Sequence, residues 1–239
     1  MIGEEGHPGF HQLGRRTIVA IDGPAGAGKS TIARHLAAHF GLLNLESGAM
    51  YRAFALKALR IGIPLDDSKA LERLAAETSI SLEPGELENR VLLDGEDVTG
   101  QLRNQIVTDA ASKVSVYPNI RSWMVRLQQH FATQGGIVME GRDIGTVVFP
   151  HADVKIFLDA APEVRGLRRF EQLGQQPGKP AMQPEEVTRD LHARDERDRN
   201  RADSPLKPAD DAVILDSTCM TLEEAVEAAE AIVAAKLNA

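Results

Sequence analysis

The first residues with evident chemistry form a glycine-rich loop that ends in a lysine and a serine. The loop reads Gly23-Pro24-Ala25-Gly26-Ala27-Gly28-Lys29-Ser30-Thr31, which fits the pattern G-x-x-x-x-G-K-[ST]. Such a loop turns successive backbone N–H groups toward phosphate oxygens, at the positive end of the following helix. We expect Lys29 to reach the β and γ phosphates of a nucleoside triphosphate and the Ser30 hydroxyl to bind Mg²⁺.

The elements on either side of this loop support the interpretation. An apolar run, Thr17–Ile21, precedes it, and a helical stretch from Lys29 to Phe40 follows. An ordinary glycine-rich turn would explain the glycines alone. It would not explain a Lys-Ser pair at the start of a helix that follows an apolar strand.

Short apolar runs elsewhere predict the sheet that carries the loop. Five runs are nearly continuous in apolar residues, as in strands buried on both faces: Thr17–Ile21, Leu42–Leu45, Ile137–Met139, Val154–Leu158 and Ala212–Leu215. Helical segments between them predict an α/β fold with a parallel sheet flanked by helices. Thr221 and Glu224 form a capping box before the last helix.

One stretch interrupts the alternation of strands and helices. Ile80–Glu83, a Pro84-Gly85 turn and a run around Asp94-Gly95 predict short antiparallel strands, because Asp-Gly favours a tight hairpin turn. Two helical patterns follow, at about 103–116 and 119–133. We therefore expect an insert, residues 68–117, between the second and third parallel strands.

Polar residues follow the predicted strands. Parallel strands end at one edge of a sheet, so these residues should meet at one crevice. They are Ser47, Tyr51 and Arg52 after the second strand, Glu140, Arg142 and Asp143 after the third, Asp159 after the fourth and Asp216 after the fifth.

Further arginines lie in two helical segments. Arg194, Asp198 and Arg201 share a helix face, and Asp195 with Arg199 has the spacing of a separate ion pair. A solvated face with weak ion pairs is the simpler alternative. Arg165, Arg168 and Arg169 are either surface residues or part of a lid, residues 165–183, that closes over phosphates.

The abundance of arginines indicates the acceptor of the phosphoryl group. A phosphate monoester is largely dianionic at pH 7 and needs guanidinium forks, whereas an alcohol would need a base. No Ser–His or carboxylate–His arrangement is evident. A nucleoside monophosphate is therefore the expected acceptor, with Lys29, Arg142, Arg194 and Arg201 as the catalytic candidates.

Over about residues 17–237 the chain resembles the bacterial cytidylate kinases, within the nucleoside monophosphate kinases. The resemblance depends on the order of several motifs: residues 21–31, 47–52, 94–98, 110–112, 141–150, 155–159, 194–201 and 215–218. It implies a P-loop NTPase-type sheet of five parallel strands, an antiparallel monophosphate-binding insert and a short lid.

The resemblance also implies a reaction and roles for residues. ATP and CMP or dCMP would give ADP and the diphosphate, with Mg²⁺. Residues 23–31 would bind ATP. The remaining assignments are Ser47, Ser112, Arg121 and Asp143 to cytosine, Arg52 and Arg142 to the acceptor phosphate, Arg194, Asp198 and Arg201 to ribose and phosphate, and Tyr51 to the substrate. Which of Arg194, Asp198 and Arg201 bind the ribose and which bind the phosphate stays open.

Other activities remain alternatives. A kinase for UMP or dTMP would share most of these features. A P-loop ATPase or GTPase switch is another alternative. A nucleotide-dependent switch or GTPase predicts a D-x-x-G at a strand end and a guanine-reading N-K-x-D. Asp97–Gly100 fits D-x-x-G in sequence, but it follows the insert hairpin and not a core strand, and N-K-x-D is absent. His35 and His39 have a zinc-ligand spacing, but a solvated helix face is the simpler interpretation.

Composition limits the partners and the compartment. The net charge of −8 and the pI of about 5.4 argue against binding a nucleic acid polymer. No apolar run or N-terminal pattern indicates a membrane span or signal peptide. The single cysteine, Cys219, fits a reducing compartment. We expect a cytoplasmic, monomeric kinase domain over 17–239 after a flexible tail, 1–16.

Overall fold

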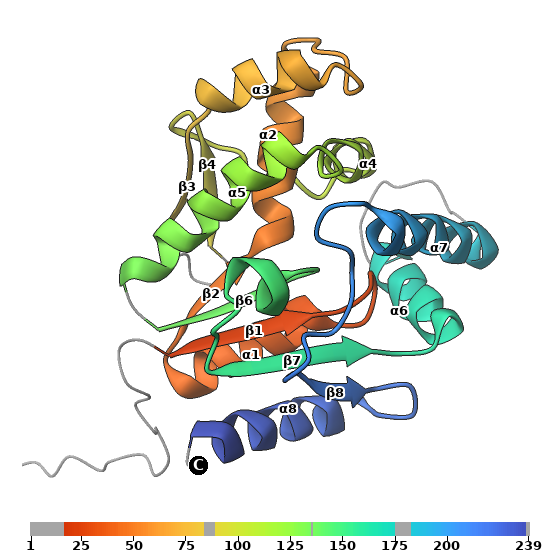
Figure 1. Cartoon of the computed structure of the whole chain (residues 1–239). Helices are drawn as coiled ribbons and strands as arrows, with labels where there is room; N and C mark the ends of the chain where they lie inside the picture. Colours follow the sequence, from red (N-terminus) through yellow and green to blue (C-terminus); the bar gives the residue numbers. More distant parts are fainter. Residues whose placement is uncertain (1–16, 84–88, 135, 175–182, 238–239) are drawn as a thin grey trace, which may run out of the picture.

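A five-stranded parallel sheet forms the centre of the computed structural model, which describes residues 17–83, 89–134, 136–174 and 183–237 (Figure 1). The strand order is β2-β6-β1-β7-β8. The strands are β1 Ile18–Asp22, β2 Leu43–Glu46, β6 Ile137–Gly141, β7 Val154–Asp159 and β8 Val213–Asp216. All five predicted strands are present, which confirms the α/β fold. Each ends one or two residues later than predicted, because backbone pairing continues past the apolar run to a polar residue or glycine.

Helices cover both faces of this sheet. α1 Lys29–Phe40 and α8 Leu222–Leu237 pack on one face against apolar residues of β1 and β7. On the other face, a π-helical turn, η3 Ile144–Val148, packs beside the strands. The predicted capping box is confirmed: the Thr221 N–H donates to the Glu224 carboxylate at 2.8 Å, and the Glu224 N–H donates to the Thr221 hydroxyl at 3.2 Å.

A second hydrophobic core lies above the sheet in Figure 1. Its residues come mainly from α2 Ser47–Arg60, α3 Ser68–Ala76, β3 Ile80–Glu83, β4 Arg90–Leu93, α4 Gln105–Val114 and α5 Pro118–Phe131. Three shorter elements lie in the same part of the chain: β5 Glu96–Asp97, η1 Thr99–Gln101 and η2 Ala132–Gln134. β3, β4 and β5 pair antiparallel, which confirms the predicted interruption of the parallel fold. The core is contributed in part by α2 and α5, beyond residues 68–117. The insert boundaries stay a prediction.

Turn chemistry explains the hairpin between β4 and β5. Asp94 and Gly95 have φ angles of 50° and 87°, as a tight two-residue hairpin requires. The predicted Pro84-Gly85 turn lies outside the described residues, as does the tail 1–16.

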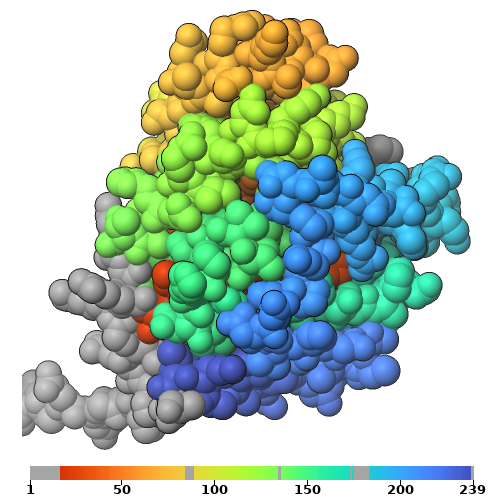
Figure 2. Space-filling view, in the orientation of Figure 1, coloured from red at the N-terminus to blue at the C-terminus, as the bar shows by residue number. Residues whose placement is uncertain are grey.

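Two helices flank the carboxyl edge of the parallel sheet. α6 Pro162–Gly174 and α7 Pro184–Asn200 lie side by side next to the glycine-rich loop (Figure 1), and Phe170, Val187 and Leu191 pack on Ala25. The chain after α7 crosses the front of the molecule to β8 (Figure 2). Within the described ranges, every helix is too short or too polar to span a membrane.

Candidate active site

The glycine-rich loop connects β1 to α1 and is held tightly against the sheet. Gly23 has a φ of 147°, and a Cβ there would lie 1.9 Å from the carbonyl oxygen of Leu158 on β7. Only glycine therefore fits at this position. At the other end of the loop, the Gly28 carbonyl accepts the N–H groups of Thr31 and Ile32, both at 3.1 Å, which starts α1. The free N–H groups of the first turn thus point to the sheet edge.

Lys29 is buried at this edge and folds back on its own loop. Its Nζ donates to the Pro24 carbonyl at 2.7 Å. Burial, followed by repulsion from Arg142, lowers the pKa of Lys29 to about 7. Burial and Arg142 outweigh the nearby carboxylates of Glu140, Asp22 and Asp195, so the phosphates of a nucleotide would stabilise the ammonium form further.

Ser30 and Glu140 form a hydroxyl–carboxylate pair beside Lys29. The Ser30 hydroxyl donates to Glu140 at 3.0 Å, and burial raises the pKa of Glu140 even though Lys29 opposes this. These oxygen donors suit Mg²⁺, which usually takes few protein ligands and completes its shell with phosphates and water. Across the described ranges, no group of three or more His, Cys, Asp or Glu could hold a metal.

The zinc alternative gains no support from the structure. The Nδ1 of His39 lies 3.1 Å from a carboxylate oxygen of Glu230 on α8, and its side chain is 46% exposed. His35 is exposed on α1. Both histidines thus belong to a solvated helix face.

Asp22, the last residue of β1, positions the loop after β6. Its two carboxylate oxygens accept the N–H groups of Ile144 and Gly145, each at 2.7 Å. Burial raises the pKa of Asp22 to about 6, although both N–H groups oppose the shift. The sequence analysis did not single out Asp22; its place at the end of a buried strand was the available signal.

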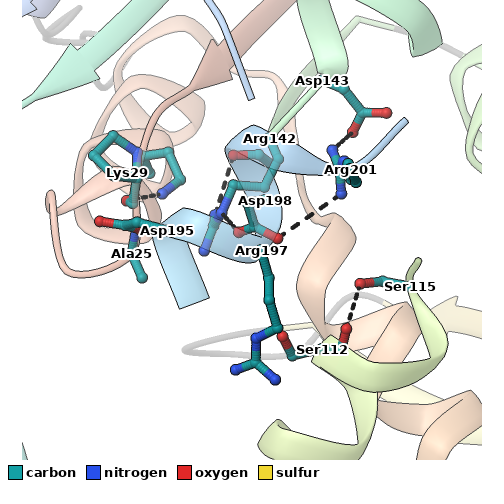
Figure 3. A network of polar contacts seen from close by, with 12 residues as sticks. Ala25, Lys29, Ser112, Ser115, Arg142, Asp143, Asp195, Arg197, Asp198 and Arg201 are labelled. Atoms are coloured by element: carbon teal, nitrogen blue, oxygen red, sulfur yellow. Dashed lines mark hydrogen bonds and ion pairs between the residues drawn. The ribbon is translucent and has the colours of Figure 1, made fainter. Parts of the chain in front are cut away.

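Residues that follow β6 meet residues of α7 in the structure. Arg142, after β6, donates through Nε to Asp198 of α7 at 2.8 Å, and Arg201 lies 3.9 Å from the other oxygen of Asp198 (Figure 3). Although burial opposes ionisation, Arg142 and Arg201 hold the pKa of Asp198 below its usual value. The arginine face of α7 is therefore part of the crevice and not a solvated surface.

Arg194 shows that this crevice carries excess positive charge. Burial, followed by repulsion from Arg142, lowers the pKa of Arg194 to about 10, with smaller contributions from Arg169 and Arg52. Among the described residues, the buried Nε atoms of Arg194 and Arg52 have no hydrogen-bond partner. A terminal nitrogen of Arg52 donates to Glu46 at 2.5 Å. We refer to Arg52, Arg142, Arg169 and Arg194 as the arginine cluster.

Next to the arginine cluster, Arg121 and Asp143 form a buried ion pair. The other carboxylate oxygen of Asp143 lies 3.8 Å from Arg201, and Asp203 lies 3.5 Å from the Arg121 Nε. Asp203 follows α7 and fits no local sequence pattern, so sequence analysis missed it. Burial raises the pKa of the nearby Tyr51 hydroxyl to about 12.

The two predicted serines come from different elements around this pair. Ser47 begins α2 and lies against the end of β6, since a Cβ on Gly141 would fall 2.6 Å from the Ser47 hydroxyl. Ser112 is buried on α4, and its carbonyl accepts the Ser115 hydroxyl at 3.0 Å (Figure 3). The Ser115 carbonyl in turn accepts from Arg121 at 3.2 Å.

The three arginines predicted for the lid face different surroundings. Arg169 is near Arg52, and burial followed by this repulsion lowers the pKa of Arg169. Arg168 donates to the hydroxyl of Ser217 at 3.0 Å and to its carbonyl at 2.8 Å, just after the end of β8. Arg165 is buried beneath the glycine-rich loop. The lid itself stays a prediction, because residues 175–182 lie outside the described ranges.

One predicted ion pair is wrong. Asp195 was expected to pair with Arg199, but it is 2% exposed and binds Arg165 at 2.5 Å. The i, i+4 spacing gave no indication that Asp195 lies on the buried side of α7. Only the packing of α7 on α6 and the loop determines this side.

The switch alternative also loses its structural basis. Asp97 belongs to the antiparallel unit, where its carboxylate accepts the backbone N–H of Thr99 at 3.0 Å and its hydroxyl at 2.7 Å. It is therefore a local cap, far from the end of any parallel strand, and not a nucleotide-sensing D-x-x-G.

The chain is similar in sequence to known proteins over most of its length. The sequence pattern of the family described as Cytidylate kinase matches residues 19–235. A cytidylate kinase of Pasteurella multocida is 47% identical over 214 residues, covering 90% of this chain and 93% of that protein. One of Solibacter usitatus is 47% identical over 224 residues, covering 94% and 95%. A solved gluconokinase structure from Sinorhizobium meliloti aligns over 95% of this chain and 96% of its own, with 15% identity and a TM-score of 0.48. The chain belongs to the cytidylate kinase family.

Proposed function

We propose that this protein transfers the γ-phosphoryl group of ATP to CMP and dCMP. The observation that carries the proposal is Arg194. Its buried Nε has no hydrogen-bond partner in the part of the chain that the structure describes, and its pKa is lowered by burial and by three neighbouring arginines. A cluster this short of negative charge, next to a phosphate-binding loop, is suited to a second phosphate.

The donor side holds ATP through backbone and cation contacts. Backbone N–H groups within residues 23–31 bind its phosphates, except those of Ala25 and Thr31, which are bound within the protein. Lys29 moves from the Pro24 carbonyl to the β and γ phosphates. Ser30, with Glu140 behind it, would hold Mg²⁺. When bound, Mg²⁺ neutralises charge on the β and γ phosphates.

The acceptor side places a monophosphate opposite the donor. Arg52, Arg142 and Arg194 bind its phosphate, with Asp198 and Arg201 toward the ribose. The acceptor phosphate is already anionic, so positioning and charge neutralisation suffice and no general base is required. This agrees with a site composed mainly of guanidinium groups.

Asp143 and Arg121 give the site a preference for cytosine. The exocyclic amine of cytosine donates to Asp143, and the ring carbonyl accepts from Arg121. Uracil and thymine present a carbonyl where cytosine has its amine. That carbonyl and the Asp143 carboxylate both accept hydrogen bonds, so neither could donate to the other. Such mismatches are costly in buried polar sites. UMP and dTMP are therefore weaker candidates.

Three broader features belong to the same proposal. Arg169 faces the arginine cluster and would take part in a lid, residues 165–183, that excludes water during transfer. The protein would act as a monomer on small molecules, with no nucleic acid polymer as partner. Its single cysteine fits the cytoplasm.

The test is ADP production from Mg²⁺–ATP with CMP, dCMP, UMP, dTMP, AMP and GMP offered separately, with a control lacking acceptor. The proposal predicts fastest turnover with CMP and dCMP, and a rate near zero without acceptor. Equal rates with and without a monophosphate would instead indicate an ATPase or switch.

A further inference from the structure

Arg165 and Asp195 form a buried ion pair that the reaction itself does not require. Their side chains are each 3% exposed, and the Arg165 Nη1 lies 2.5 Å from the Asp195 Oδ2. The partners belong to different helices, α6 and α7. Burying two charges costs free energy unless each also makes further hydrogen bonds. The remaining hydrogen bonds of this pair therefore indicate what it holds in place.

Those hydrogen bonds go to the glycine-rich loop. The Ala25 N–H donates to Asp195 at 3.0 Å, and the Ala25 carbonyl accepts from Arg165 at 2.9 Å. Both backbone polar groups of Ala25 are therefore bound by the ion pair. The Arg165 Nε donates to the Ala160 carbonyl at 2.9 Å, which fixes the guanidinium to the end of β7.

The next loop residue shows how closely α6 packs here. Gly26 has a φ of 78°, and a Cβ there would lie 3.0 Å from the Arg165 carbonyl oxygen and 3.3 Å from the Arg165 Cβ. The conformation of the loop and the position of α6 thus depend on each other.

The same helix also carries groups assigned to the acceptor. Figure 3 shows Asp195 beside Ala25 and Lys29, while Asp198, one turn farther along α7, and Arg201, just after its end, meet Arg142 and Asp143. One helix thus binds the donor loop through Asp195 and contributes to the acceptor site through Arg194, Asp198 and Arg201.

We propose that Arg165 and Asp195 are positioning residues that hold the donor loop in its phosphate-binding conformation and set α7, with its arginines, in register with that loop. Arg165 has a second role, which is electrostatic. The Asp195 carboxylate lies beside a loop that must accept highly charged phosphates, and Arg165 neutralises it. This differs from the sequence-based interpretation, in which Arg165 closes over the phosphates from a lid.

The two partners should therefore respond differently to substitution. Arg165→Met leaves a buried carboxylate next to the phosphates and should weaken ATP binding by about tenfold or more. Asp195→Asn keeps an oxygen for the Ala25 N–H and removes the negative charge. It should leave ATP affinity within about threefold of wild type, even where it lowers thermal stability. The double variant should regain most of the affinity that Arg165→Met loses.

The experiment measures ATP dissociation constants by calorimetry without acceptor, together with KM for ATP, KM for CMP and the melting temperature. Arg199→Met is the matched control, because Arg199 is exposed on the same helix and has the sequence spacing to pair with Asp195. It should leave ATP affinity unchanged. If Arg165→Met does not fold, the comparison of Asp195→Asn with the double variant remains, along with Arg165→Lys, which keeps the charge but loses the fork.

Several outcomes would overturn the proposal. Equal loss of ATP affinity in Arg165→Met and Asp195→Asn, without recovery in the double variant, would show that Arg165 does not act by neutralising Asp195. If every variant had a lower melting temperature but unchanged ATP affinity, the pair would stabilise the fold without positioning the donor loop for ATP. Of these measurements, only the KM for CMP depends on the proposed function. If wild type binds ATP but does not phosphorylate CMP, the proposed function fails while the ATP comparison still decides the role of the pair.

Discussion

The donor and acceptor halves of the site differ in how completely their polar groups are paired. In the donor half, Lys29 binds Pro24, Ser30 binds Glu140, and both polar groups of Ala25 are bound by Arg165 and Asp195. In the acceptor half, four buried arginine nitrogens have no hydrogen-bond partner among the described residues: Arg52 Nε, Arg194 Nε, Arg121 Nε and Arg201 Nη2. The last two lie near carboxylates, at 3.5 Å from Asp203 and 3.8 Å from Asp143.

This difference indicates two ways of binding phosphate. The donor half is preorganised by its own hydrogen bonds, so nucleotide binding replaces a few internal contacts. The acceptor half keeps like charges close together, so its monophosphate provides the missing counter-charge. Unpaired buried polar groups cost free energy, and this cost is removed only when the acceptor is present. Four variants and conditions would break or sharpen the contrast.

Removal of Lys29, the cation of the donor half, should lower activity more than any of the other changes. Lys29→Ala should lower kcat by roughly 10²–10³-fold with CMP and dCMP alike, because it removes a donor to the charge that develops on the transferred phosphoryl group. Steady-state kinetics with both acceptors check this. Lys69→Ala, at an exposed position on α3, is the control. A loss confined to one acceptor would assign Lys29 to acceptor recognition.

Arg194→Met should lower activity but raise the stability of the free protein. It should lower kcat/KM for CMP by about 10²-fold, since one phosphate contact is lost. It should also stabilise the free protein by about 1–3 kcal/mol at pH 7. The pKa of Arg194 is lowered in the folded protein, so its charge opposes folding. Chemical denaturation gives the stability and kinetics the activity. A variant less stable than wild type would contradict the charge account.

Asp143→Ala should affect the acceptor half alone. We expect KM for CMP to rise about tenfold or more while KM for ATP stays within about twofold, because one base contact is lost and the donor loop keeps its hydrogen bonds. The preference for CMP over UMP should narrow as well. Unchanged CMP affinity would show that Asp143 does not contact the base.

The pH dependence of ATP binding should give the smallest effect. The pKa of Lys29 is about 7 in the free protein, and the ammonium form is the one that binds phosphate. ATP affinity should be steady between pH 6 and 7 and then fall, by up to about tenfold per unit, as the free protein loses the proton. Calorimetry at pH 8 in two buffers of different ionisation enthalpy should detect proton uptake. Constant affinity from pH 7 to 9 would contradict this.

The same contrast explains what could be predicted from sequence. The donor loop is a local feature, because nine consecutive residues and the flanking strand and helix contain its chemistry. The parallel strands and the Asp94-Gly95 hairpin were predictable for the same reason. Residues 84–88 and 175–182 lie outside the described ranges, so the insert and lid boundaries stay predictions.

The acceptor half is assembled from distant segments and was predictable only in part. The rule that parallel strands end together brought Arg52 and Arg142 to one edge, and resemblance to a family added Arg121 and Ser112. Asp22 and Asp203 were missed because their partners are far along the chain. Arg165 was assigned to a lid because its spacing does not reveal which side of α6 faces the loop.

The most direct test of the contrast is the change in melting temperature of wild-type protein with CMP or with cytidine at the same concentration. A ligand that binds only the folded state raises the melting temperature according to its affinity. If the acceptor half lacks a counter-charge that the monophosphate provides, CMP should stabilise the protein clearly and cytidine hardly at all. Equal stabilisation by cytidine and CMP would show that the base carries recognition, and would contradict the account.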